Sequence, residues 1–488
     1  MGKTLTLAIL KYVALFALLL ASMWLACALD WEPAVTFFGT LGAFLAADFA
    51  SARRKEPTVP QVGIKWSPSG PSLPDIFRNA NNSVLILGTS NFRLIHDELS
   101  EVRKWLEAKE HRIFGLLFLA PFSPHASGRA RREVRRSSRE SIISSLQTAE
   151  AEAERHARMI PAVYDGPYRY SAYAVDVGNV GDQYESKCSS INIFTSSHQR
   201  GLAKGFHISL LAGKSQDEYS FYKEEILELW RSTLANPPGH GVSCTFRRGL
   251  NLSDATVRQY HSLLRSGDNS ELGALHIFSD QQLHLTLTSI CRTQRSSFLG
   301  PLCIQNGQEP LPAHFGEFLH EVIAAASDHV NSRARIELTQ LYIDEHGVIQ
   351  LRGNRDQGST PFEVLDSFLR YVSTLVDEFA DRYPNEHWHE QAVGRGERRF
   401  GPKYNLFSPH VSIGVAFSSS TALPARLTGH SISVRLPCPL TFNAEELTIV
   451  HYAYRSLLRL VGELRVPAEP GMVPDGERVL AQLGIARP

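Results

Sequence analysis

Two short stretches of this chain carry the same alternation of histidine, aliphatic residue, hydroxyl and aliphatic residue. One begins at His284 and the other at His410. Because successive side chains of a β-strand point to opposite faces, each stretch predicts a strand with one polar and one apolar face. The apolar faces belong in a core. Any fold of this chain must therefore hold an imidazole and a hydroxyl next to each other on each of two strands.

If the two strands lie together, His284 and His410 meet at one small site with the hydroxyls of Thr286 and Ser412. An imidazole titrates near neutral pH, so a pair can supply one general base and one general acid. A hydroxyl donates a hydrogen bond to a phosphoryl oxygen without adding charge. The four residues predict cleavage of a phosphodiester without a metal ion or another cofactor. Either histidine taken alone is better explained as a half-buried strand residue.

A third stretch with the same alternation begins at His207. It precedes the segment 236–241, whose prolines and glycines predict a linker between domains. Pairing His207 with His284 would leave no room for the helix and hairpin expected between two motifs of one domain. We therefore interpret His207 as a structural residue and pair His284 with His410.

The segment from 237 to 468 shows a regular order of elements around the stretches at His284 and His410. Apolar residues with period 3.6 predict the helices, and runs of β-branched and aliphatic residues predict the strands. The predicted helices cover 313–329 and 361–383, and the predicted strands cover 283–290, 336–343, 347–354, 410–416, 447–450 and 458–466, with Phe442 in a further closing strand.

In this order, the motifs His284-x-Thr286 and His410-x-Ser412 resemble those of the 2H phosphoesterase superfamily. The resemblance implies an α+β domain of two lobes that form one cleft. It also implies hydrolysis or transesterification of phosphodiesters on ribose, such as 2′,3′-cyclic ends of RNA or 2′–5′ linkages in small oligonucleotides. One histidine would take a proton from water and the other would protonate the leaving oxygen, while Thr286 and Ser412 hold the non-bridging oxygens.

Two questions stay open at this point. The motifs are nearly symmetric, so the sequence does not say which histidine is the acid. Tyr452 and Tyr454 follow a predicted strand and would either stack on a base or pack in the core. The main alternative function is a nucleotide sensor or effector without hydrolysis at a membrane, with a role in antiviral defence.

The middle segment, 72–236, alternates predicted strands with predicted helices, which favours an α/β layer fold. The stretch 79–88 and the later Leu119-Ala120-Pro121 loosely resemble phospholipase-D-like domains. The defining His-x-Lys motif of that family does not occur here, so we expect a domain without its catalysis. The resemblance implies a sensory or scaffolding role instead.

A run of arginines lies inside this middle segment. It is typical of a solvated helix face, but it would also suit a phosphate-rich ligand or the anionic surface of a membrane. The arginines are Arg129, Arg131, Arg132, Arg135, Arg136 and Arg139.

The N-terminal residues predict a membrane anchor. Apolar runs cover 12–29 and 34–47, with basic residues outside both and acidic residues in the turn between them. By the positive-inside rule, both ends and the rest of the chain face the cytoplasm. The alternative is a cleaved signal peptide that ends near Cys27. The anchor makes the lipid bilayer an expected partner, beside the nucleotide or short RNA.

Composition excludes some classes of site. The formal net charge is zero, so no global basic field draws the chain to nucleic acid. The six cysteines are scattered without a CxxC pair, which argues against a disulfide framework or a zinc site. His387 and His389 are two apart and would diverge on a helix, so we expect no metal there. The predicted domains are the anchor 1–55, the linker 56–71, the α/β domain 72–236, the two-lobed domain 237–468 and a tail 469–488.

Overall fold

The structure of the protein is a computed structural model. The predicted anchor and the linker after it lie outside the described residues. Within the rest of the chain, residues 72–485 are described except 89–90, 124–137, 167–169, 178–188, 196–205, 213–215, 248–271, 280, 293–301, 305–309, 330–334, 354–361, 392–397, 405, 419–422, 426–431, 444–446, 455 and 468.

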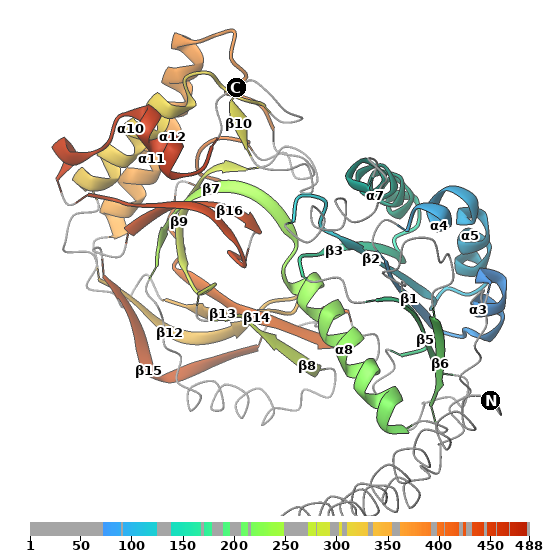
Figure 1. The fold of residues 1–488 in the computed structure, drawn as a ribbon. Helices are drawn as coiled ribbons and strands as arrows, with labels where there is room; N and C mark the ends of the chain where they lie inside the picture. The colour runs from blue at the N-terminus through green and yellow to red at the C-terminus, as the bar shows by residue number, and fades with distance from the viewer. Residues whose placement is uncertain are drawn as a thin grey trace, which may run out of the picture. The chain divides into compact units, whose positions relative to one another are not determined.

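The first part of the described chain forms a six-stranded mixed sheet in the order β3-β2-β1-β4-β5-β6 (Figure 1). Strands β1, β2 and β3 pair in parallel, and β4, β5 and β6 continue the sheet antiparallel. The strands are β1 (Ser83–Leu87), β2 (Ile113–Leu119), β3 (Met159–Tyr164), β4 (Ser171–Val175), β5 (Ser190–Thr195) and β6 (Phe206–Leu211). The helices are α3 (Leu73–Asn79), α4 (Phe92–Asp97), α5 (Leu99–Glu107), α7 (Ser138–Arg155) and α8 (Gln216–Ala235).

Helices and strands alternate from α3 to β3, as predicted, whereas β3, β4, β5 and β6 follow one another with no helix described between them. Strand β2 is apolar along its length and buried from Phe114 onward, as expected for a parallel strand covered on both faces. The start of β1 is tied to the end of β4 by one carboxylate, because Asp176 accepts backbone hydrogen bonds from Asn81, Asn82 and Ser83.

The second part forms a nine-stranded sheet in which neighbouring strands pair antiparallel. The order is β15-β12-β13-β14-β9-β7-β16-β17, with β8 paired to β14. Strands β7 and β9 pair with each other in the interior of this order, and both are curved in Figure 1. The strands are β7 (Pro238–Phe246), β8 (Leu272–Ile277), β9 (Leu285–Arg292), β12 (Arg335–Ile343), β13 (Val348–Arg352), β14 (His410–Ser418), β15 (Ile432–Asn443), β16 (Leu447–Tyr454) and β17 (Leu460–Arg465). A separate short pair is β10 (Cys303–Ile304) and β11 (Pro310–Leu311).

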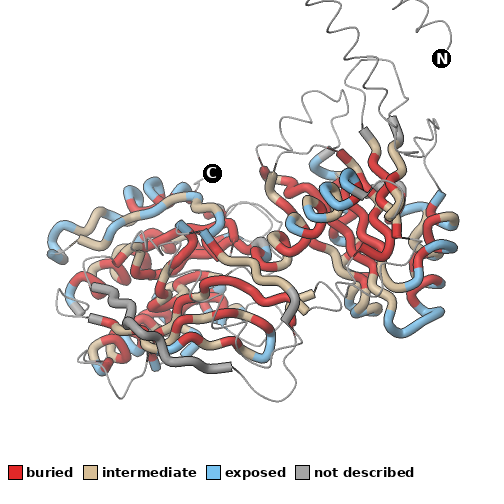
Figure 2. Tube along the Cα trace, turned by 90° about the horizontal axis from the view of Figure 1, so that it is seen from below, coloured by how far each residue is buried: buried red, intermediate tan, exposed pale blue. Residues whose placement is uncertain are grey.

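Three helices, α10 (Phe315–His329), α11 (Phe362–Arg382) and α12 (Gly476–Gln482), share one core with this sheet. Strands β14 and β16 are mostly buried, and Figure 2 shows the buried residues in red along the tube of this part of the chain. The apolar stripe predicted for α11 is buried as expected. Helix α12 lies in the segment predicted as a tail, and its Val479 and Leu480 belong to the same core. A short 3-10 helix (Pro470–Met472) precedes it.

The prediction of an interdomain linker at 236–241 is corrected, because residues 238–241 are the start of β7 and only 236–237 connect it to α8. The segment's prolines and glycines predict a turn, but Val242, Cys244 and Phe246 downstream alternate into the core and extend the strand. Gly241 is needed there for space, since a Cβ at this position would lie 2.4 Å from the hydroxyl of Tyr452. The third stretch falls in β6, so His207 lies in the six-stranded sheet and the two motifs lie in the nine-stranded sheet.

Within the residues that the structure describes, no helix is both long and apolar enough to cross a bilayer.

Candidate functional site

The two motifs lie on neighbouring strands of the nine-stranded sheet. Leu285 of β9 pairs with Val411 of β14, and both side chains are fully buried. Opposite residues of an antiparallel pair point to the same face, and their neighbours along each strand point to the other. The half-buried flanking residues therefore share the second face of the sheet. They are His284, Thr286, His410 and Ser412.

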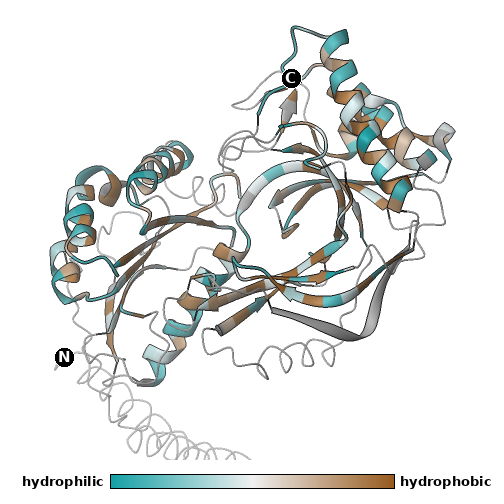
Figure 3. Cartoon of the chain, turned by 180° about the vertical axis from the view of Figure 1, so that it is seen from behind, coloured by the Kyte–Doolittle hydropathy of each residue, from teal (hydrophilic) through white to brown (hydrophobic). Residues whose placement is uncertain are grey.

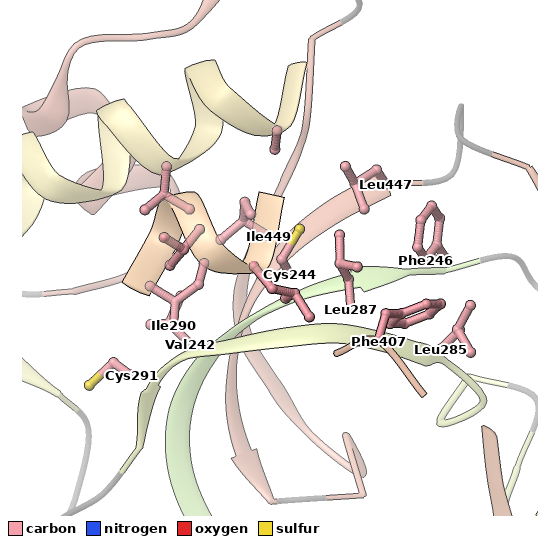
Figure 4. Close-up of a cluster of buried hydrophobic side chains, with 14 of the residues drawn as sticks. Val242, Cys244, Phe246, Leu285, Leu287, Ile290, Cys291, Phe407, Leu447 and Ile449 are labelled. Carbon is pink, nitrogen blue, oxygen red and sulfur yellow. The ribbon is translucent and has the colours of Figure 1, made fainter. Parts of the chain in front are cut away.

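Figure 4 shows the apolar face that fixes this arrangement. Leu285 lies beside Phe407, and Leu287 extends between Cys244 and Phe246 of β7. All five residues belong to the main core cluster. A slip of one residue in β9 would exchange this face for the polar one, so the core specifies the register that exposes the motif. Figure 3 shows hydrophilic and hydrophobic residues along the same strands.

Both histidines are oriented by the same backbone contact. Nδ1 of His284 lies 2.6 Å from the carbonyl oxygen of Gln282, and Nδ1 of His410 lies 2.9 Å from that of Ser408. A carbonyl oxygen only accepts, so Nδ1 donates in each ring and carries the proton. In the neutral ring, Nε2 is then left with its lone pair. Each motif thus presents a ring nitrogen that can accept a proton.

The environment of His284 favours the neutral ring. Burial lowers its pKa to about 4, against the opposing effect of the hydrogen bond to Gln282. The charges of Arg247 and His410 lower the pKa further, which places both groups within electrostatic range of His284. At neutral pH His284 is therefore poised to take up a proton, not to give one.

A buried polar network holds the turn before His284. The side chain of Gln282, 5% exposed, accepts from the amide and hydroxyl of Ser279 at 3.0 Å. Its amide nitrogen donates to Asn236 at 2.8 Å. The hydroxyl of Ser456 donates to the same Asn236 oxygen, and Asn236 contacts His276 at 3.4 Å. The polar atoms satisfy one another, so the carbonyl of Gln282 has a fixed position.

The corresponding turn before His410 is held differently. Ser408, whose carbonyl accepts from His410, is exposed. The segment is held at the preceding residue, where the amide of Phe407 donates to the buried carboxylate of Asp366 at 2.7 Å. Phe407 itself packs in the core. The Ser408 carbonyl that accepts from His410 is therefore held through one hydrogen bond at the preceding residue, whereas the Gln282 carbonyl is held by a network of polar side chains.

Other polar side chains lie on the same face as the motifs, and sequence analysis missed them. Gln350 of β13 pairs with Ser412, and Arg352 pairs with His410. Tyr342 of β12 pairs with Gln350. Arg247 follows Phe246, the partner of Leu285, so the alternation places it beside His284. The alternation Val348-Ile349-Gln350-Leu351-Arg352 was a usable signal, but only the register joins it to the motifs.

Tyr452 and Tyr454 are not available for stacking on a base. They are 8% and 3% exposed, and Tyr452 packs with Val450 and Leu457 in a small cluster. Burial raises the pKa of Tyr454, as does the carboxylate of Asp165. Core packing, the alternative for these tyrosines, is what the structure shows.

Other arginines that the structure describes make their contacts elsewhere. Of the predicted arginine run only Arg139 is described, and its Nε donates to the carbonyl of Pro121 at 3.1 Å. Arg398 and Arg399, in the segment between the motifs, are paired with Asp377 and Glu390. In the described part of the chain, no three His, Cys, Asp or Glu residues lie close enough to hold a metal ion.

Comparisons with protein-family models, with curated proteins and with solved structures found no match for this chain.

Proposed function

We propose that this protein is a phosphodiesterase that uses two histidines and no metal ion. Its substrates are 2′,3′-cyclic or 2′–5′ phosphodiesters of RNA ends or small oligonucleotides. One observation carries the proposal: two imidazoles with the same Nδ1 anchor and two hydroxyls share one face of a sheet through the pairing of Leu285 with Val411. This arrangement supports the resemblance to 2H phosphoesterases that the motifs suggested.

The arrangement assigns a role to each group. Nε2 of His284 takes a proton from water as the water oxygen bonds to phosphorus. Nε2 of His410, in its protonated form, gives a proton to the ribose oxygen as the bond from phosphorus to that oxygen breaks. A cyclic diester thereby becomes a monoester and a free hydroxyl. The hydroxyls of Thr286 and Ser412 donate to the non-bridging oxygens, where negative charge grows in the transition state.

His284 suits the role of base because its surroundings keep the ring neutral. Burial lowers its pKa to about 4, so its Nε2 lone pair is present at neutral pH. The pH dependence of kcat/KM reports groups of the free enzyme. We therefore expect its acidic limb to be centred near pH 4 instead of near the ordinary histidine value of about 6.5.

The N-terminal apolar runs suggest where in the cell the enzyme acts. Two such runs with basic residues outside them would hold the catalytic sheet at the cytoplasmic face of a membrane. A substrate would then be a soluble nucleotide or RNA end that reaches the membrane surface.

The test is cleavage of a dinucleotide that ends in a 2′,3′-cyclic phosphate, by the purified full chain in EDTA. His284→Ala and His410→Ala should each lower kcat about 100-fold to 10,000-fold, the range for loss of a general acid or base. His207→Ala is the matched control, because it alters the same kind of stretch in the other sheet, and it should keep wild-type activity. Activity that survives both motif substitutions would reject the proposal.

The same experiment separates the alternative function. A sensor without hydrolysis would bind the dinucleotide tightly in a titration and leave it intact over the time in which the wild-type enzyme should turn over. Activity that is lost in EDTA would instead require a metal ion that the four motif residues do not explain.

A further inference from the structure

The polar face that carries the motifs has an arginine on either side of them. Arg247 lies beside His284, and its guanidinium pairs with Glu463 and donates to the carbonyl of Gln281 at 3.2 Å. Arg352 lies beside His410 on β13. Among the residues that the structure describes, no carboxylate pairs with Arg352. Within the described residues, the charge of Arg247 is therefore compensated by a carboxylate and that of Arg352 is not.

The guanidinium of Arg352 is held in a defined orientation. It lies over the ring of Tyr342, 3.4 Å from the ring centre, and its Nε donates to Oε1 of Gln350 at 2.9 Å. Stacking fixes the plane and the bond to Gln350 fixes the rotation. The N–H groups on the two terminal nitrogens are left over, and this is the fork that binds phosphate through two parallel hydrogen bonds.

The register places this fork next to the reacting group of the proposed function. Gln350 pairs with Ser412 and Arg352 pairs with His410, so β13 is the strand directly beyond the second motif. Adjacent strands are separated by about 4.8 Å. A phosphate bound at Arg352 would thus lie one or two strand spacings from the scissile phosphate, whose non-bridging oxygens contact Thr286 and Ser412.

We propose that Arg352, supported by Tyr342 and Gln350, forms a second anion subsite that binds a further phosphate of the substrate. The inference rests on the proposed function and makes it more specific. The preferred substrates are oligonucleotides, or cyclic ends that carry another phosphate, and a cyclic mononucleotide with a single phosphate is a poor substrate. Arg247 does not compete for this phosphate, because Glu463 already offsets its charge.

The experiment compares two probes that differ by one group. Both are mononucleotides with a 2′,3′-cyclic phosphate, and one also carries a 5′-phosphate. We measure Kd of the full-length His284→Ala chain by titration, so that neither probe is consumed, and kcat/KM of the wild-type chain. Charge-assisted hydrogen bonds predict about a tenfold to hundredfold preference for the 5′-phosphorylated probe in both measurements.

The substitution Arg352→Gln should bring the ratio of the two affinities close to one. Arg352→Lys should keep part of the ratio, since it retains the charge but not the planar fork. Arg370→Gln, on the exposed surface of α11, is the matched control and should leave the ratio unchanged. A melting curve for each variant establishes that it folds.

Two results would overturn the subsite. Equal affinity of the parent chain for the two probes would show that no second phosphate is recognised. An equal loss for both probes in Arg352→Gln would place Arg352 at the scissile phosphate instead. Failure of the proposed function looks different, because the preference then appears in the titrations while neither probe is cleaved. Absence of binding by both probes rejects the subsite as well.

Discussion

The two motifs orient their histidines by the same kind of hydrogen bond, but different neighbouring residues hold the accepting carbonyl in place. Each histidine donates from Nδ1 to the carbonyl two residues before it. Behind His284 that carbonyl belongs to Gln282, whose side chain is enclosed in a satisfied polar network. Behind His410 it belongs to exposed Ser408. Under the proposed mechanism, the difference predicts that His284, the base, is held more rigidly than His410, the acid.

The half of the sheet that carries His284 also holds other buried imidazoles. His240 of β7 and His451 of β16 are 6% and 0% exposed, with ring centres 6.0 Å apart. Burial lowers the pKa of His240 to about 3 and that of His451 to about 4. Together with His284, they concentrate neutral histidines on β7, β9 and β16.

The largest expected effect follows from these three histidines. In the unfolded chain they bind protons below about pH 6.5, but in the native chain they do so only near pH 3 to 4. Unfolding therefore takes up protons, and the free energy of unfolding falls as the pH drops below 6.5. Three such groups give a slope approaching about 4 kcal/mol per pH unit near pH 5. Urea unfolding between pH 7 and pH 5 measures it.

Single substitutions test this account. His451→Gln should remove about one third of the slope, because one of three protons is no longer taken up. His346→Gln, at an exposed position of the loop before β13, should change nothing. If the free energy of unfolding of His451→Gln depends on pH as steeply as that of the wild type, the buried histidines are not the cause of the acid sensitivity.

The second prediction concerns the hydroxyls of the two motifs, and we expect the loss of either one to lower kcat by a similar factor. Thr286→Val and Ser412→Ala should each lower kcat about 100-fold to 1,000-fold, as loss of one donor to a developing oxyanion does. Thr288→Val, in the same strand as Thr286, should keep kcat within about threefold. Its hydroxyl donates to the backbone carbonyl of Ser289. A large effect at one motif only would show that the phosphoryl group is bound from one side.

Much of the fold around the site was predictable from periodicity. The stripe of α11 and the alternation of β9, β12 and β14 appear at the expected positions, because each apolar face is long and regular. Strand β15 was predicted only at its end, since it contains Pro437 and Pro439, which normally argue against a strand. It lies at the edge of the sheet, where the missing N–H groups need no partner.

The candidate site was predictable only in part, for a different reason. His284 and His410 with their hydroxyls carry a local signature that one strand can show. Gln282 does not, because its partners Asn236 and Ser456 are 46 and 174 positions away. Arg352 likewise gains its position from the register of β13 with β14. Local pattern gives the groups proposed to react, and tertiary pairing gives the groups that orient them.

The third prediction removes the network behind His284. Gln282→Leu keeps the carbonyl that accepts from His284, but it removes the acceptor for the amide and hydroxyl of Ser279 and one of the two donors to the Asn236 oxygen. The unpaired groups should lower the free energy of unfolding by about 1 to 3 kcal/mol. A looser turn should also lower kcat/KM about tenfold to a hundredfold, since small displacements of a catalytic group cost this much.

A change in the pH profile would distinguish positioning from stability alone. If water reaches His284 in Gln282→Leu, its pKa rises from about 4 toward the ordinary histidine value of about 6.5. The acidic limb of kcat/KM then moves to higher pH. A variant that is less stable but keeps the wild-type limb would show that the network supports the fold and not the base.

The smallest effect is expected for the equivalent change behind His410. Ser408→Ala removes an exposed hydroxyl and keeps the carbonyl that accepts from Nδ1 of His410. The amide of Phe407 still donates to Asp366, so the segment stays in place. We expect kcat/KM within about threefold of wild type and stability within about 0.5 kcal/mol, as at an ordinary surface position. A loss as large as that of Gln282→Leu would mean that His410 is held as firmly as His284, and the predicted contrast in rigidity between the base and the acid would fail.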